Sequence, residues 1–292
     1  MPLILDGKKV AQKLKDQLKV EIENIKLKFN RIPGLAVIQV GNVAASSVYV
    51  KAKTKAAKEV GINVIDHHLE ESTNQNDLIN LVNELNNNDD VNGILVQLPL
   101  PKNINEEMIL NSIAPDKDAD GFHPLNVGKL SISQKNDENL MIPCTPYGCL
   151  LLLRELNVDL VGKNAVVIGR SNIVGKPMAQ LLLKESCTVT TVHSKTKNIE
   201  SICKNADILI AAIGKPEFVN KDWVKEGAII IDVGINRIKI NEEKSKLVGD
   251  VLFSDVEDKV SAISPVPGGV GPMTIACLLR NTTAACKLKN YN

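Results

Sequence analysis

The chain has 292 residues, a formal net charge of +1 at pH 7 and 44% hydrophobic residues. This length predicts two domains, and the near-neutral charge argues against a nucleic-acid partner or an anionic membrane surface. Aromatic residues make up only 3% of the chain, so no base-stacking surface is expected. No apolar run approaches the ~20 residues of a membrane span, and no basic segment precedes an apolar core at the N-terminus. We therefore expect a cytoplasmic protein without a signal peptide.

The six cysteines and four histidines show no pattern of a metal site or a disulfide framework. The cysteines lie mostly inside apolar segments and form no C-x-x-C pair, which is typical of buried free thiols in a cytosolic protein. The histidines are scattered along the chain. We therefore expect no bound metal.

Helices and strands are predicted to alternate in the first half of the chain. Asp6 can cap a helix whose apolar residues recur at helical spacing as far as Phe29. Further helices are expected at about 45–60 and 78–85, and strands at 35–40, 62–67 and 93–97. Such alternation implies parallel strands and an α/β unit. This unit contains no glycine-rich phosphate-binding turn.

The alternation continues after a polar interval at 131–138, which we interpret as an exposed loop near the domain junction. Helices are expected at 147–156, from Val174, at 199–204 and at 273–288, and strands at 165–168, 187–192, 207–212 and 228–233. The pattern predicts a second α/β domain of Rossmann-like type with a mostly parallel sheet.

A glycine turn joins the strand at 165–168 to the next helix. Such a turn places backbone N–H groups and the positive end of a helix dipole together, which suits a pyrophosphate. Gly169 fits the first position of G-x-G-x-x-G, but Ser171 and Val174 occupy the other two, and Gly175 comes one residue late. The turn alone leaves open a plain α/β unit without a nucleotide.

The segment after the following strand indicates which nucleotide is bound. An NAD-binding enzyme typically carries Asp or Glu about 20 residues beyond the turn, to hold the ribose 2′-hydroxyl. Here residues 193–197 (HSKTK) supply hydroxyls and cations instead, and Arg170 lies in the turn itself. Positive charge without a carboxylate favours the 2′-phosphate of NADP. A solvated basic loop is the alternative.

A tyrosine, a lysine and a glutamine in the first half are candidate site residues. Tyr49 and Lys53 are spaced i, i+4, so both lie on one face of the expected helix. The alternative is a solvated lysine-rich face. Gln97 ends a strand, and ligands of open α/β sheets collect at the carboxyl ends of strands.

Three further motifs carry unusual residues. Residues 116–122 (DKDADGF) resemble a cation loop but lack the Glu and the spacing of an EF-hand. Cys144 is a possible nucleophile without a histidine close in sequence. Residues 264–274 (SPVPGGVGPMT) combine three prolines with three glycines, so a flat ligand or another backbone can approach closely. Since a simple turn rarely needs so many constrained positions, a functional role is favoured.

Taken together, these motifs resemble the bifunctional methylenetetrahydrofolate dehydrogenase/methenyltetrahydrofolate cyclohydrolase family. They are, in chain order, Ser46-x-x-Tyr49-x-x-x-Lys53, Val96-Gln-Leu-Pro-Leu-Pro101, Asp118-x-Asp-Gly121, Pro143-Cys-Thr-Pro146, Gly169-Arg-Ser-x-x-Val-Gly175 and Pro265-Val-Pro-Gly-Gly-Val-Gly-Pro-Met-Thr274. The resemblance covers essentially the whole chain. No ligase domain is appended, so a short form is implied.

The resemblance implies two reactions of one-carbon metabolism, which supplies purine biosynthesis. NADP⁺ takes a hydride from 5,10-methylenetetrahydrofolate, and water then opens the methenyl product to 10-formyltetrahydrofolate. By this resemblance Lys53 is the general acid/base of the hydrolytic step, and Gln97 supports it. Tyr49 orients the folate, and Asp120 binds the pterin.

The resemblance also implies the ligand contacts. The substrate-binding residues are Ser46, Tyr49, Val96, Leu98, Pro99, Asp120, Pro267, Gly268 and Gly269. The NADP-binding residues are Cys144, Thr145, Gly169, Arg170, Ser171, Val174, Gly175, His193, Ser194, Ile235, Gly271 and Thr274.

We expect residues 1–140 with the final helix, 273–292, to form a folate-side domain, and residues 141–272 to bind NADP. The catalytic residues are expected to line the cleft between them, and the resemblance implies a homodimer. Two alternatives remain open. One is another two-domain NADP-dependent dehydrogenase of the shikimate type, and the other is a non-catalytic NADP sensor.

Overall fold

The computed structural model describes residues 1–42, 44–133, 140–241 and 244–291. These residues form two compact units, each with its own parallel sheet. One unit contains residues 1–11 and 145–274, and the other contains residues 12–133, 140–144 and 275–291. An α/β fold with a mostly parallel sheet is therefore confirmed.

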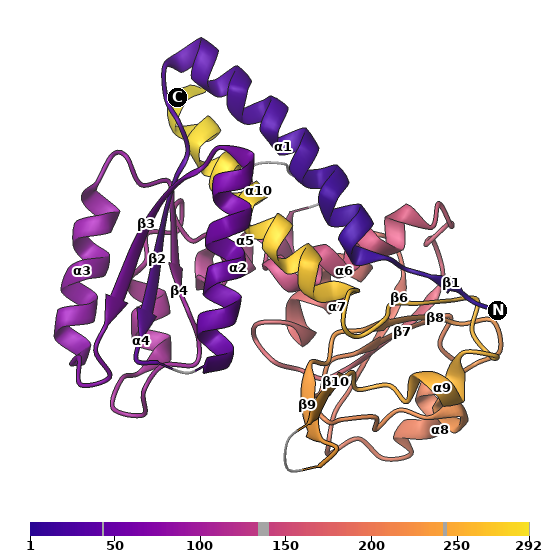
Figure 1. Ribbon diagram of the computed structural model, residues 1–292. Helices are drawn as coiled ribbons and strands as arrows, with labels where there is room; N and C mark the ends of the chain where they lie inside the picture. The colour runs from indigo at the N-terminus through magenta and orange to yellow at the C-terminus, as the bar shows by residue number, and fades with distance from the viewer. Residues whose placement is uncertain (43, 134–139, 242–243, 292) are drawn as a thin grey trace. The chain divides into compact units, whose positions relative to one another are not determined.

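The three-stranded sheet has the order β3-β2-β4 and is parallel throughout. Its strands are β2 (Gly34–Val40), β3 (Asn63–Leu69) and β4 (Gly93–Val96). The helices that precede, separate and follow these strands in the sequence are α1 (Gly7–Phe29), α2 (Ala44–Val60), α3 (Gln75–Asn87), α4 (Glu106–Ser112) and α5 (Pro124–Ile132). Figure 1 shows α2 and α3 running alongside the strands. Every residue of β2 is buried, as expected of a central strand covered on both faces.

Local sequence accounts for the helices of this unit. The Asp6 carboxylate accepts hydrogen bonds from the N–H groups of Lys8 and Lys9 at 2.9 and 3.2 Å, which confirms the predicted cap of α1. In α3 the apolar residues at i, i+4 and i+7 are all buried and pack into the core of the sheet: Leu78, Val82 and Leu85.

The last helix, α10 (Val270–Tyr291), runs beside α1 in Figure 1. An ion pair of 3.0 Å between Lys287 and Glu21 joins the two helices. This helix begins three residues earlier than the sequence predicts, inside the run of prolines and glycines.

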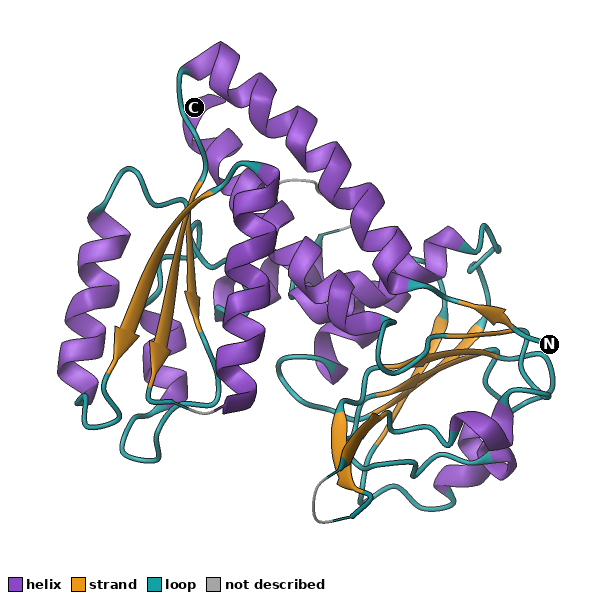
Figure 2. Ribbon diagram, viewed as in Figure 1, coloured by secondary structure: helices purple, strands orange, loops and turns teal. Residues whose placement is uncertain are grey.

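The larger sheet is six-stranded and parallel, with the order β1-β11-β8-β7-β5-β6, and Figure 2 shows its strands in orange. Its strands are β1 (Leu3–Ile4), β5 (Asn164–Ile168), β6 (Thr188–Val192), β7 (Ile208–Ala211), β8 (Ile229–Asp232) and β11 (Ala262–Ile263). The associated helices are α6 (Cys144–Glu155), α7 (Gly175–Lys184), α8 (Ile199–Cys203), α9 (Phe253–Val256) and the short η1 (Lys221–Trp223). An antiparallel hairpin of β9 (Asn236–Lys239) and β10 (Ser245–Val248) completes the elements.

The start of the chain belongs to this larger sheet, whereas the sequence places residues 1–140 together. Strand β1 pairs with β11, and the N–H of Leu3 donates to the carbonyl of Ser261 at 2.9 Å. The backbone of Gly269 also lies so close to Gly7 that a side chain would not fit there. A two-residue strand has no periodicity of its own, so the local sequence could not reveal this pairing.

All six cysteines are buried free thiols, as the sequence predicts. Within the described part of the chain, no helix has both the length and the apolar character needed to cross a membrane.

The buried ammonium of Lys117 closes the C-terminal end of α3. It donates to the carbonyls of Leu85, Asn86 and Asn88 at 3.0, 2.7 and 2.7 Å. The carbonyls of Leu85 and Asn88 also accept from the N–H groups of Asn88 and Val91 at 3.3 and 3.2 Å, whereas Lys117 is the donor to the Asn86 carbonyl in the last turn. The same contact anchors the segment in which Asp120 lies.

We expect Lys117→Met to lower the free energy of unfolding by about 1–3 kcal/mol, because the Asn86 carbonyl would lose its donor and those of Leu85 and Asn88 would each lose one of two. Urea unfolding followed by circular dichroism measures this loss. The control is Lys102→Met, since Lys102 is exposed. Equal midpoints for the two variants would contradict the role of Lys117.

Candidate active site

A buried lysine is the centre of the polar cluster in the smaller sheet's unit. Lys53 is only 4% exposed, whereas Lys51 and Lys55 on the same helix are exposed. Its ammonium donates to the Oε1 atom of Gln97 at 3.2 Å and lies 5.2 Å from the ring centroid of Tyr49. The solvated lysine face considered above therefore does not describe Lys53. A buried cation held by a neutral amide is typical of a functional lysine.

Gln97 is positioned by the end of β4. Its backbone N–H donates to the carbonyl of Ile38 at 2.8 Å, and its side-chain amide donates to the carbonyl of Leu98 at 2.7 Å. The second bond turns Oε1 toward the Lys53 ammonium. The other predicted substrate residues nearby differ in exposure. Val96 packs in the core, so only its backbone can meet a ligand, and Pro99 is exposed.

Two aspartates of the D-A-D-G segment have different surroundings. Asp118 is buried, and its carboxylate accepts hydrogen bonds from the N–H groups of Gly121 and His123 and from the Asn126 amide at 2.8–3.0 Å. Its acceptor capacity is used by the loop itself. Among the described residues, none donates a hydrogen bond to the carboxylate of half-buried Asp120. That carboxylate is therefore available to a ligand.

Asp120 lies within electrostatic reach of Lys53. Burial raises the pKa of the Asp120 carboxyl above its usual range, and the Lys53 cation opposes that shift. A backbone bridge between Asp118 and Ile94 sets the segment beside β4, the strand that leads to Gln97. The structure thus brings together Tyr49, Lys53, Gln97 and Asp120, which the sequence places up to 71 residues apart. No group of three metal-ligating side chains occurs in the described ranges.

Asn281 supports this cluster and was not predicted from the sequence. It has no exposed surface, and its side-chain amide donates to the carbonyls of Ala119 and Ile142 at 2.9 Å each. It therefore ties α10 to the segment before Asp120 and to the segment before Cys144. Asn281 lies in a polar run of the final helix, residues 280–283 (RNTT), so the local sequence did not single it out.

Cys144 is not suited to act as a nucleophile. Its thiol is buried and donates to the carbonyl of Ala119 at 3.3 Å. Burial raises the pKa of this thiol well above its usual range, and the Asp120 charge adds to the shift. The reactive thiolate is thus disfavoured.

The turn between β5 and α7 requires both of its glycines. Gly169 has φ = +127°, and a Cβ there would collide with the carbonyl oxygen of Ala212. A Cβ on Gly175 would collide with the carbonyl oxygen of Gly169. The Ser171 hydroxyl accepts hydrogen bonds from the N–H groups of Val174 and Gly175 at 3.1 and 3.3 Å. Ser171 thus satisfies the first N–H group of α7, which begins at Gly175, one residue later than predicted.

A cavity of about 570 Å³ opens at this turn. It lies at the carboxyl ends of β5, β6 and β7, three neighbouring parallel strands, where open α/β sheets bind ligands. The predicted cofactor residues among its lining are Gly169, Arg170, Ser171, His193 and Ser194. Lys215 and Phe218 also line it and were not predicted, whereas no carboxylate does. The cavity therefore fits a nucleotide with an additional phosphate.

Other predicted cofactor residues lie outside the lining of this cavity. The hydroxyls of Thr145 and Thr274 are 3.0 Å apart, and a Cβ on Gly271 would lie 3.7 Å from the side chain of Ile235. These four residues belong to the unit of the six-stranded sheet. Cys144 is assigned to the other unit.

The run of prolines and glycines is as constrained as its composition predicts. The Val266–Pro267 bond is cis, and Gly268 has φ = +111°. A Cβ on Gly269 would lie 2.6 Å from the carbonyl oxygen of Pro265. The side chain of Ser46, another predicted substrate residue, lies outside the described residues.

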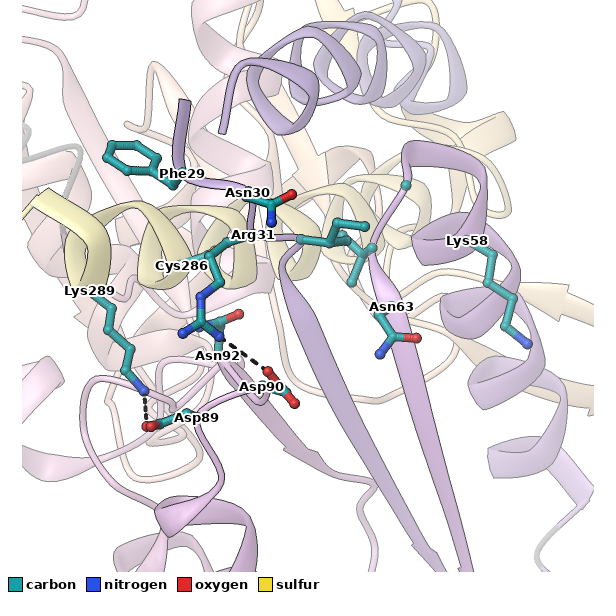
Figure 3. A pocket seen from close by; sticks show the side chains of 13 residues that line it. Phe29, Asn30, Arg31, Lys58, Asn63, Asp89, Asp90, Asn92, Cys286 and Lys289 are labelled. Atoms are coloured by element: carbon teal, nitrogen blue, oxygen red, sulfur yellow. Dashed lines mark hydrogen bonds and ion pairs between the residues drawn. The ribbon is translucent and has the colours of Figure 1, made fainter. Parts of the chain in front are cut away.

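A second hollow, of about 950 Å³, lies elsewhere in the unit of the smaller sheet, and Figure 3 shows its side chains. Its lining includes Gly61 and Asn63, which precede and begin β3, so it opens at the amino end of that strand. Four of its charged side chains form two ion pairs: Arg31 with Asp90 at 3.3 Å, and Lys289 with Asp89 at 2.6 Å. It is therefore separate from the polar cluster of Lys53.

Two family models match the chain. The catalytic-domain model for tetrahydrofolate dehydrogenase/cyclohydrolase matches residues 5–120, and the NAD(P)-binding-domain model of the same family matches residues 143–290. Both units are therefore represented in the match.

Several relatives and solved structures are similar to this chain over almost its full length. The bifunctional protein FolD of Acetivibrio thermocellus is 54% identical, over 98% of this chain and 97% of the relative. The crystal structure of the bifunctional dehydrogenase/cyclohydrolase of Campylobacter jejuni has a TM-score of 0.93 at 48% identity, covering 99% and 100%. The Trypanosoma brucei enzyme, whose structure holds NADP and an inhibitor, has a TM-score of 0.93 at 38% identity, covering 99% and 98%.

We expect Gly169→Ala to destabilise the six-stranded unit by about 3 kcal/mol or more, because strain at φ = +127° adds to the collision with Ala212. The matched control is Gly162→Ala, where φ is +72° and no atom lies within 4 Å, so the cost is about 1–2 kcal/mol. The single tryptophan, Trp223, is buried in this unit's core and reports unfolding by fluorescence. Equal losses in the two variants would contradict the steric argument.

Proposed function

Because the chain belongs to the tetrahydrofolate dehydrogenase/cyclohydrolase family, we propose that it oxidises 5,10-methylenetetrahydrofolate with NADP⁺ and hydrolyses the product to 10-formyltetrahydrofolate. The observation that carries the proposal is the buried Lys53 ammonium, held by Gln97 beside Asp120. A sensor without catalysis would not need a buried cation there. We propose that the unit with Lys53 binds the folate and that the unit with Arg170 binds NADP.

The dehydrogenase step needs a positioned donor carbon and a positioned cofactor. NADP⁺ supplies the hydride acceptor. In the proposal the Arg170 guanidinium and the Ser194 hydroxyl, both in the lining of the 570 Å³ cavity, hold the 2′-phosphate. The Tyr49 ring and the Asp120 carboxylate orient the folate, since a carboxylate can accept two parallel hydrogen bonds from the pterin. Positioning of this kind supplies much of the rate of a hydride transfer.

The cyclohydrolase step needs proton transfer as well. Water adds to the methenyl carbon and loses a proton, and the bond from that carbon to N5 then breaks while N5 gains a proton. In the proposal the neutral amine of Lys53 accepts the proton that water loses, and the resulting ammonium, held by Gln97, returns a proton to N5. An absorbance assay with methylenetetrahydrofolate and NADP⁺ tests the function by following the formation and decay of the methenyl product.

We further propose a cytoplasmic homodimer without a nucleic-acid or membrane partner, as the family resemblance and the charge of +1 support. Sedimentation equilibrium tests the dimer.

Lys53→Met should separate the two activities, because methionine keeps the apolar packing but removes the titrating amine. We expect cyclohydrolase activity to fall by ~10²–10⁴-fold while dehydrogenase activity stays measurable. The methenyl product should then accumulate. Lys55→Met is the control, since Lys55 lies on the same helix and is exposed. Intact cyclohydrolase activity in Lys53→Met would refute the role of this lysine.

Arg170→Ala should reduce the preference for NADP⁺ over NAD⁺, because an arginine–phosphate pair would be lost. By analogy with buried charge pairs, the interaction lost is worth about 2–4 kcal/mol, and it should lower kcat/KM for NADP⁺ but not for NAD⁺. The measurement is the ratio of kcat/KM for the two cofactors. Lys176→Ala serves as the control, because Lys176 lies in the first turn of α7 but does not line the cavity. An unchanged ratio in Arg170→Ala would assign the 2′-phosphate to other residues.

A further inference from the structure

One wall of the 570 Å³ cavity depends on a buried carboxylate outside it. Asp250 has no exposed surface, and its Oδ2 atom accepts hydrogen bonds from the N–H groups of Ile213 and Gly214 at 2.7 and 2.9 Å. These two residues begin the segment 213–218, which follows β7 and contributes Ile213, Lys215 and Phe218 to the cavity lining. The segment contains no helix or strand, so regular structure does not fix its conformation.

The other end of this segment is hydrogen-bonded to the backbone of Gly249 and Asp250. The N–H of Glu217 donates to the carbonyl of Gly249, and the N–H of Val219 donates to the carbonyl of Asp250, both at 2.9 Å. Between the two attachments, the Lys215 ammonium lies 4.9 Å from the ring centroid of Phe218. Asp250 and its neighbour therefore hold both ends of the wall.

Asp250 is itself fixed by buried partners. The side-chain amide of Asn236 donates to its Oδ1 atom at 2.9 Å. The carboxylate of Asp232, only 4% exposed, accepts hydrogen bonds from the N–H groups of Asp250 and Val251 at 2.9 Å each. Hydrogen bonds to a carboxylate are roughly twice as strong as neutral ones. The end of β8, where Asp232 lies, thus sets the place of Asp250.

We propose that Asp250 is a positioning residue for NADP: it holds the segment 213–218 in the conformation that binds the cofactor. The inference rests on the proposed function, because it takes this cavity as the NADP site. Without the carboxylate the segment samples other conformations, and the apparent affinity falls in proportion to the time spent in the binding one. Cyclohydrolase activity, assayed from methenyltetrahydrofolate without cofactor, does not use this wall.

The test compares Asp250→Ala with Asp250→Asn. Alanine removes both acceptors, whereas asparagine keeps one oxygen for the N–H groups of Ile213 and Gly214. If the wall of the alanine variant holds the binding conformation about a tenth of the time, the Kd for NADP⁺ rises about tenfold. Asparagine should recover part of that loss. Cyclohydrolase rates should stay within about twofold of the unmodified protein in both variants.

Asp255→Ala is the matched control. Its carboxylate also accepts a hydrogen bond from a loop N–H, that of Lys221 at 2.8 Å, but neither residue lines the cavity. We expect its Kd for NADP⁺ to be unchanged, and a rise equal to that of Asp250→Ala would overturn the proposal. Titration calorimetry of the full chain with NADP⁺ alone measures each Kd.

An unchanged Kd in Asp250→Ala overturns the proposal, as does a cyclohydrolase rate that falls as far as NADP⁺ affinity. If the alanine variant does not fold, Asp250→Asn decides: a raised Kd with intact cyclohydrolase activity supports the role, and an unchanged Kd overturns it. Failure of the proposed function is recognised separately, because the unmodified protein would then neither bind NADP⁺ nor oxidise methylenetetrahydrofolate.

Discussion

The polar cluster in the unit of the smaller sheet depends on the burial of one charge. An ammonium removed from water needs an acceptor, and the fold supplies the amide oxygen of Gln97 to Lys53 at 3.2 Å. An amide orients the ammonium without cancelling its charge, whereas a carboxylate at that distance would form an ion pair. Parallel pairing of β2 and β4 makes the contact possible. It sets Val96, the last residue of β4, opposite Ile38, so that the N–H of Gln97 donates to the carbonyl of Ile38 and fixes the position of Gln97.

Buried aspartates repeatedly fix loops that have no regular structure. Asp118 holds the turn through Gly121 and His123, and Asp250 holds the start of the segment 213–218. In each case carboxylate oxygens replace the carbonyl partners that a helix or sheet would provide. Asp120 differs, because none of the described protein groups donates a hydrogen bond to its carboxylate. Whether an aspartate supports a loop or stays available to a ligand is therefore decided by where the surrounding N–H groups point.

Much of the fold could be predicted from local sequence, and much of the site could not. Apolar runs located strands such as β2, and Asp6 located the start of α1, because both signals lie in adjacent residues. The burial of Lys53 was not evident, because α2 carries several exposed lysines of similar spacing. The contacts of Asn281 join it to carbonyls about 140–160 residues earlier in the chain. Only the resemblance to a known family placed Tyr49, Lys53, Gln97 and Asp120 in one site, and it did not point to Asn281.

The pairing of β1 with β11 has a consequence for synthesis on the ribosome. Leu3 and Ile4 are synthesised 259 residues before their partners, Ala262 and Ile263. At roughly 5–20 residues per second, the first strand waits on the order of 10–50 s for its neighbour. Most of the unit of the smaller sheet, apart from α10, is made while this segment remains unpaired, and the six-stranded sheet is completed only after Ala262 and Ile263 are made. Premature stops would thus leave an unclosed sheet edge, a form that chaperones and proteases recognise.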